Sequence, residues 1–235
     1  MLINSNNSSR IDDGSFELTM GDHIISRTKT YCYLGVIMDD KLSWGDHIND
    51  LCLKLSQVAG TIYKTRTLLS QKARLLIYHS LVSSKLRYGL ICWGTASKFL
   101  LKKVNVAHNK IIRYLTFSKP CSRAWPLYCK LKVLPLEILI QVEWGKTVYR
   151  HKSHTLPPVF NNYFHTPSHN HNTRYAANNN LEVIRVTNAR DKALLRYIGP
   201  KVWSEIPSTI KESNSVKSFV TAYRSYLLDN FSGQV

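Results

Sequence analysis

The central part of the chain, residues 51–136, carries 16 lysine and arginine residues and neither aspartate nor glutamate. On a helix, opposite charges three or four residues apart are stabilising, whereas like charges at that spacing are destabilising. Any helix in this stretch must therefore take its stability from apolar packing and not from ion pairs on its surface. The positive charge favours a polyanionic partner, nucleic acid first and an anionic membrane surface second, with plain solvation of the helix surfaces as the alternative.

Composition narrows the class of protein further. The 235 residues have a formal net charge of +17 and are 44% hydrophobic, which excludes a wholly disordered chain. No window approaches the roughly 18 consecutive apolar residues of a membrane-spanning helix, and residues 1–10 are too polar for a signal peptide. The five cysteines form no C-x-x-C pair and are predicted to be reduced thiols. These features predict an intracellular protein of the cytoplasm or nucleus that is neither secreted nor transmembrane.

Hydrophobic periodicity predicts an α+β fold that is mainly helical. Before the helices, alternating apolar residues on either side of Gly21 and Asp22 predict a β-hairpin, and residues 31–38 predict a third, more buried strand. An Asn- and His-rich loop is expected over 161–180, followed by a short strand over 181–186. Apolar spacings of three and four predict helices over 46–68, 71–87, 97–117, 136–152 and 216–230.

The predicted helix over 97–117 has two contrasting faces. At about 100° per residue, its apolar side chains gather on one side of the helical wheel. Four bases share an arc of about 100° on the opposite side, which predicts a wholly basic face suited to phosphate contact: Lys102, Lys103, Lys110 and Arg113.

A paired-aspartate turn, Asp39 and Asp40, is similar to the catalytic turn of a reverse transcriptase. Polymerase chemistry uses two metal ions held by carboxylates from separate strands. The earlier acids Asp12, Asp13 and Asp22 lie in polar surroundings without a strand of that kind. The pair is therefore interpreted as an exposed turn that leads into a helix, with no catalytic residue in this chain.

The remaining chemistry-bearing residues predict no metal site. His165, His169 and His171 have spacings compatible with zinc, but structural zinc usually draws on closely spaced thiolates, which are absent nearby. A polar loop is the favoured interpretation. The tryptophans are interpreted as core anchors rather than base-stacking platforms: Trp93, Trp125, Trp144 and Trp203.

Several short motifs, taken in order, resemble the region just after the polymerase core of reverse transcriptases from non-LTR (LINE-type, jockey-like) retrotransposons. The first is the stretch that begins Tyr33-Leu34-Gly35 and continues to residue 44. The others are Tyr88-Gly89, Trp93-Gly94, Pro157-Pro158, residues 169–174 and residues 199–203.

The resemblance implies a three-part organisation. Residues 1–44 would be a palm-edge β segment, 45–117 a helical thumb and 118–235 a mixed C-terminal region. Tyr33, Leu34 and Gly35 match the primer-grip motif. The expected nucleic-acid contacts match the thumb by location only: Lys54, Lys64, Arg66, Lys102, Lys103, Lys110 and Arg113.

The resemblance also implies a function. The expected protein is part of an RNA-directed DNA polymerase that lacks the catalytic core, contacts template and primer through its thumb and is not an enzyme on its own. No cofactor is expected, because Mg2+ would belong to the missing core. The expected partners are RNA, DNA or an RNA–DNA duplex, with the missing core as a further candidate. The alternative is a non-enzymatic host protein that uses the same helices as a nucleic-acid-binding or protein-interaction scaffold.

Overall fold

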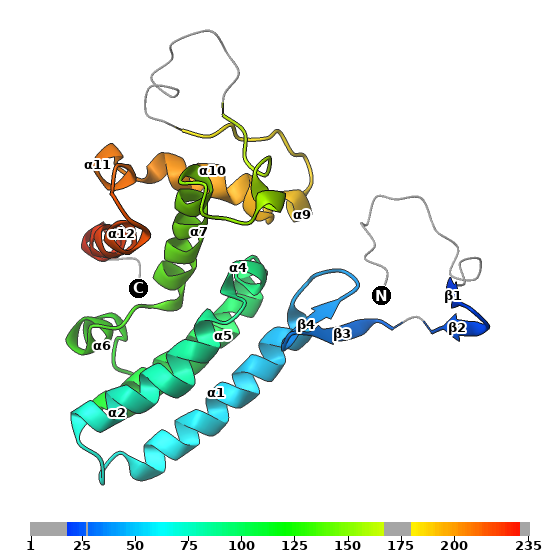
Figure 1. Ribbon diagram of the computed structural model, residues 1–235. Helices are drawn as coiled ribbons and strands as arrows, with labels where there is room; N and C mark the ends of the chain where they lie inside the picture. The colour runs from blue at the N-terminus through cyan, green and yellow to red at the C-terminus, as the bar shows by residue number, and fades with distance from the viewer. Residues whose placement is uncertain (1–17, 27, 167–179, 231–235) are drawn as a thin grey trace.

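The computed structural model describes residues 18–26, 28–166 and 180–230, and within them the chain is mainly helical with two small β-hairpins (Figure 1). The predicted α+β class is confirmed. Among the described residues, no helix is both long and apolar enough to cross a membrane. The predicted helices over 46–68, 71–87, 97–117, 136–152 and 216–230 are all present. The last two have the predicted ends, the first and third differ by one to three residues at each end, and the second contains a π-helical turn.

Both hairpins are antiparallel pairs. β1 (Leu18–Met20) pairs with β2 (His23–Ile25) around the predicted turn, and β3 (Thr30–Tyr33) pairs with β4 (Val36–Asp39). The prediction of one buried strand over 31–38 is wrong. The chain reverses at Leu34 and Gly35, whose φ angles of 47° and 78° are those of a tight type I′ hairpin turn. As a result β3 is exposed and β4 is only half-buried.

The turn between β4 and the first helix is built around Asp39. Its carboxylate accepts hydrogen bonds from the backbone N–H groups of Lys41, Ser43 and Trp44, at 2.9 to 3.0 Å. Partial burial acts to raise the pKa of Asp39, but these N–H groups outweigh it and the pKa is lowered. The carboxylate therefore fixes the start of α1 (Gly45–Thr65), in agreement with the predicted turn into a helix.

Five helical segments follow α1: those over 71–87 return towards its start, and the last then runs alongside it. They are α2 (Gln71–Ile77), the π-helix η1 (Tyr78–Ser83), α3 (Ser84–Arg87), α4 (Leu90–Trp93) and α5 (Lys98–Thr116). α1 and α5 lie side by side in Figure 1 and bury apolar stripes. Two contacts show that they run in the same direction. Lys103 Nζ lies 3.4 Å from Asn49 Oδ1 near the starts of both helices, and the rings of Tyr63 and Tyr114 are 4.9 Å apart near their ends.

The second half of the chain is arranged around α7. α7 (Leu136–Lys152) packs against α10 (Leu195–Glu205) and α12 (Val216–Asn230), and the contact with α12 is close enough that a Cβ on Gly145 would lie 2.7 Å from the ring of Tyr223. The buried side chains of both halves form one continuous cluster, and the predicted boundaries at 44 and 117 stay predictions. The segments are α6 (Trp125–Leu131), α7 (Leu136–Lys152), the 3-10 helix η2 (Pro158–Phe160), α9 (Ala189–Lys192), α10 (Leu195–Glu205), α11 (Ser208–Lys211) and α12 (Val216–Asn230).

Two features of this half differ from the sequence predictions. The strand predicted over 181–186 is wrong, because that segment pairs with no other strand among the described residues. The helices α6, α9, α10 and α11 were not predicted, and in α10 Pro200 interrupts the helical pattern. The expected loop over 161–180 falls mostly outside the described residues.

A cluster of buried polar side chains lies in the core between η1, α5 and α6. The Tyr78 hydroxyl lies 2.9 Å from His108 Nε2, and the two rings are stacked. The ring of Tyr128 packs edge-on against the same imidazole, and its hydroxyl donates a hydrogen bond to Asn109 Oδ1 at 2.8 Å. Complete burial lowers the pKa of His108 to about 3, so the imidazole is neutral at physiological pH.

We expect acid to destabilise the protein through His108. In the unfolded chain this imidazole takes up a proton near pH 6.5, whereas the folded protein resists protonation until about pH 3. Stability is therefore lost as the pH falls below about 6.5, and His108 alone should contribute a loss of about 2 kcal/mol by pH 5. Between about pH 6.5 and pH 5, the free energy of unfolding measured with urea should decrease less for His108→Gln than for the wild type. An identical pH dependence would contradict this assignment.

Candidate nucleic-acid interface

Three of the four bases on the predicted face of α5 are exposed: Lys102, Lys103 and Lys110. The ammonium of Lys103 lies 5.3 Å from the centre of the Phe99 ring, and that of Lys110 lies 5.9 Å from the centre of the Tyr114 ring. Both aromatic contacts leave the charge at the surface. The lysines thus follow the helix axis on the exposed side, where phosphates could reach them.

Arg113 has a different environment. It is half-buried, and its Nε–H donates a hydrogen bond to the backbone carbonyl of Ser122 at 3.0 Å. The guanidinium therefore ties the segment after α5 back to the helix. A helical wheel gives the angle of Arg113 but carries no information on the loop that folds over it.

The face is not wholly basic, and that prediction is wrong. Phe99 and Val106 lie within the arc of the lysines and are 70% and 61% exposed. Apolar side chains so exposed are available to a partner, which gives the face a mixed basic and apolar character.

The basic residues of α1 differ among themselves. Lys54 forms an ion pair with Asp50 at 2.7 Å, one helical turn earlier, and is half-exposed. Lys64 is exposed in the last turn of α1. Asp50 is the last acid before the acid-free stretch, and its ion pair partly balances the positive charge of Lys54.

Arg66 sits in an aromatic cluster where α1 and α5 end. Its guanidinium lies 4.2 Å from the centre of the Tyr63 ring, 5.7 Å from that of Tyr114 and 5.2 Å from that of Phe117. Arg74 was not among the sequence candidates, yet it also lies over Phe117, at 4.5 Å, and donates from Nη1 to the Arg66 carbonyl at 3.1 Å. The i, i+3 pair of Tyr63 and Arg66 was the available signal for half of this cluster.

The predicted primer-grip residues form the tip of the β3–β4 hairpin. Tyr33 and Leu34 are exposed there, Leu34 by 72%. The hydroxyl of Tyr88, at the end of α3, donates a hydrogen bond to the Leu34 carbonyl, 54 residues away in sequence. Next to it, Gly89 has a φ of +61°, and a Cβ there would lie 2.9 Å from Val36 Cγ2. The Tyr88-Gly89 motif therefore holds the hairpin, which carries the Tyr33-Leu34-Gly35 motif, against the helices.

His47 makes a second link between the hairpin and α1. Its Nδ1 accepts a hydrogen bond from the backbone N–H of Ile37 at 3.4 Å, and its ring lies 6.0 Å from that of Trp93. Burial lowers the pKa of His47, while the charge of Asp50 acts to raise it and that of Lys54 to lower it. The neutral ring is the form that can accept the Ile37 hydrogen bond.

The described residues contain no group of three or more His, Cys, Asp or Glu side chains placed to share a metal ion. His165, which is described, lies 3.3 Å from an Arg196 nitrogen, whereas His169 and His171 fall outside the described residues. The Asp39 carboxylate accepts hydrogen bonds from backbone N–H groups of the turn before α1.

Comparison with known proteins gives three similar sequences, all polymerases of mobile elements. The "Probable RNA-directed DNA polymerase from transposon X-element" of Drosophila melanogaster is 29% identical over 104 residues, which are 43% of this chain and 12% of the relative. The "RNA-directed DNA polymerase from mobile element jockey" of Drosophila funebris is 28% identical over 120 residues, 49% of this chain and 13% of the relative. Part of the chain is thus similar to part of the jockey-like transposon polymerases.

The jockey-like relationship confirms the family predicted from the sequence motifs. The jockey polymerase of Drosophila melanogaster is 28% identical over 103 residues, 42% of this chain and 11% of the relative. The aligned part thus spans about an eighth of the length of the curated relatives. No protein-family profile matches this chain, and no solved structure matches it.

We expect Gly89→Ala to loosen the hairpin. An alanine at a φ of +61° is strained, and its Cβ would overlap Val36, so the substitution should destabilise the protein by about 1 to 3 kcal/mol. Urea unfolding and the hydrogen-exchange protection of the Ile37 amide would measure the effect.

Gly60→Ala is the matched control. Gly60 lies within α1, and nothing lies within 4 Å of the Cβ that alanine would add. Alanine there should stabilise the helix by about 0.5 to 1 kcal/mol. Equal effects of the two substitutions would show that the hairpin does not depend on the close approach at Gly89.

Proposed function

We propose that this chain is the part of a jockey-like RNA-directed DNA polymerase that follows the palm, and that α1 and α5 bind the backbone of the template–primer duplex. The polymerase names of the three relatives support the first half of this proposal. The second half depends on the structure.

The observation that carries the proposal is the pairing of α1 and α5. The two helices run in the same direction, and over 51–136 their exposed bases have no acid among them. Lys64, Lys103 and Lys110 are exposed, and Lys102 continues the row on α5. A row of cations along parallel helices fits a sugar–phosphate backbone, which is bound through charge with little sequence preference.

The hairpin adds a second contact at the start of α1. Tyr33 and Leu34 project from its tip, close to the Tyr88 hydroxyl that holds the turn. In the proposed complex this tip touches the primer strand, while the lysines of α5 track the duplex. Because Tyr88 and Gly89 fix the hairpin against the helices, both contacts keep a defined separation.

The two hairpins also present an apolar surface for the rest of the polymerase. Met20, Ile24 and Ile25 in the first hairpin and Tyr31 in the second are at least half-exposed. Exposed apolar residues on short strands are suited to being covered by a neighbouring sheet. In this proposal the polymerase core is the partner, the Mg2+ ions belong to that core, and the complex acts inside the cell.

The exposed side chains of Phe99 and Val106 are the observation that favours the alternative function. Their exposure on the lysine face would suit a protein partner, as expected of a host protein that uses these helices as an interaction scaffold. Such a scaffold would bind duplex only weakly, and the salt dependence of duplex binding separates the two functions.

We expect Lys103→Gln with Lys110→Gln to lower the salt dependence of duplex binding. Each phosphate contact contributes about 0.9 to the slope of log K against log salt on a DNA duplex, so the loss should be about 2 units. Fluorescence anisotropy over a range of salt concentrations would measure the slope. Both lysines are exposed, so stability should change by only about 0.5 kcal/mol each.

The matched control is Lys192→Gln with Lys217→Gln. These lysines are exposed on α9 and α12, and their loss changes the net charge by the same amount. The control should keep the wild-type slope. An unchanged slope in the α5 variant, or an equal decrease in both variants, would exclude α5 as the duplex-binding helix.

We also expect the purified chain to be silent as a polymerase. Asp39 is engaged by the backbone of the turn before α1, so it is not available as one of a set of metal-binding carboxylates. Primer extension with template–primer, dNTPs and Mg2+ or Mn2+ should not exceed a buffer control. Extension that is lost in an Asp39→Ala, Asp40→Ala variant would contradict the proposal.

A further inference from the structure

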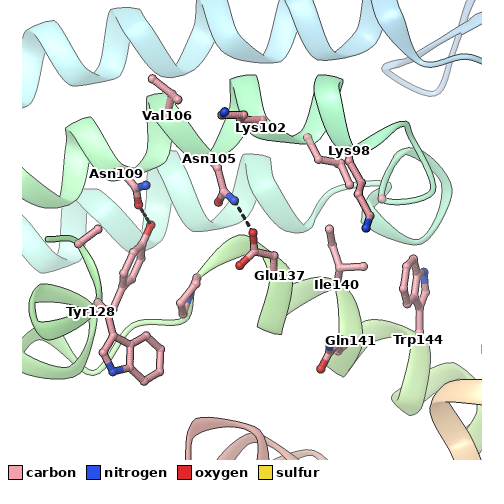
Figure 2. A pocket seen from close by; sticks show the side chains of 15 residues that line it. Lys98, Lys102, Asn105, Val106, Asn109, Tyr128, Glu137, Ile140, Gln141 and Trp144 are labelled. Carbon is pink, nitrogen blue, oxygen red and sulfur yellow. Dashed lines mark hydrogen bonds between the residues drawn. The ribbon is translucent and has the colours of Figure 1, made fainter. Parts of the chain in front are cut away.

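A cavity of about 650 Å3 lies between α5, α6 and α7, on the other side of α5 from α1 (Figure 2). Its volume falls within the roughly 300 to 1,000 Å3 typical of small-molecule sites. Figure 2 shows Lys98 and Trp144 at one end, and Asn109 and Tyr128 at the other. Of the residues that line it, the sequence predictions and the duplex-binding proposal use Lys102 alone for nucleic-acid contact, at the edge between the cavity and the lysine face of α5.

The walls combine flat rings with amide groups. Trp125, Tyr128 and Trp144 contribute rings. Asn105 donates a hydrogen bond to Glu137 at 2.8 Å, which orients its amide, and the side chain of Gln141 makes no hydrogen bond within the described part of the chain. Rings offer stacking surfaces to a nucleobase, and amide and carboxylate groups can pair with its edge.

The charge at the cavity favours an anion. Lys98 and Lys102 line it and are exposed, and neither ammonium group has an ion pair or hydrogen bond among the described residues. In Figure 2 the side chain of Lys98 points from α5 towards the α7 side. Glu137 is the acid of the lining, and one of its oxygens is already bound by Asn105. The occupant that fits is therefore flat on one side and anionic on the other.

We propose that this cavity binds one unpaired nucleotide of a single-stranded segment. The base lies among the rings and amides of the cavity, and its phosphate lies against Lys98 and Lys102. An apolar peptide would satisfy the rings but would leave both lysines without a counter-charge. A paired base cannot enter, because its edge is already bonded and its faces are stacked.

The test uses tryptophan fluorescence of the full chain with a short single-stranded oligonucleotide. A base that stacks in the cavity should quench the emission, and most of this change should be absent from Trp144→Phe. In Lys98→Gln with Gln141→Leu, the affinity for the oligonucleotide should fall by about tenfold or more, as expected for the loss of a phosphate contact and a base contact. Full quenching in Trp144→Phe, or unchanged affinity in the double variant, would overturn the proposal.

Two further measurements separate this site from the duplex-binding face. The Lys98, Gln141 variant should bind a blunt duplex like the wild type, while the Lys103, Lys110 variant should keep the quenching amplitude at saturating oligonucleotide. Loss of both properties in both variants would overturn the assignment of a separate site. If blunt duplex is not bound at all but the quenching depends on Trp144, the proposed function fails and the cavity assignment stands.

Discussion

Apolar contact between α1 and α5 holds together the stretch over 51–136, which contains no aspartate or glutamate of its own to balance its bases. Leu55 and Ile62 from α1 and Ile111 and Leu115 from α5 are almost completely buried in this layer. Because the packing and not the surface charge stabilises these helices, Lys102, Lys103 and Lys110 of α5 keep their charge for a partner, whereas Lys54 of α1 is paired with Asp50. For the same reason, substitutions of the exposed lysines should change the stability of the helix pair little, whereas substitutions of its buried apolar residues should lower it strongly.

Much of the fold was predictable because helical periodicity is a local property of the sequence. The two clearest errors came from features that depend on distant partners. Residues 181–186 look like a strand, but a strand needs a neighbour, and none is present among the described residues. The tight turn at Leu34 and Gly35 was missed because leucine is not a usual residue for a positive φ, and it is held by Tyr88, which lies 54 residues further on.

The candidate site shows the same limit at the level of side chains. The helical wheel placed Lys102, Lys103 and Lys110 correctly at the surface, because that depends only on the helix. It could not foresee that Arg113 binds the Ser122 carbonyl, or that Arg66 meets a ring from α5, since both depend on how other segments return to the helix. The cavity beside α5 is likewise formed by three helices, and no short motif describes it.

The π-helix η1 sets the rotational phase between two anchored tyrosines. Tyr78 is fixed at its start by His108 in the core, and Tyr88 is fixed beyond its end by the Leu34 carbonyl. A π-helical turn accommodates one residue more than an α-helical turn, and one residue corresponds to about 100° of rotation. A regular α-helix through residues 78–83 would thus point Tyr88 away from the hairpin. The extra residue acts as a spacer that lets the core and the hairpin be satisfied by a single continuous helical segment.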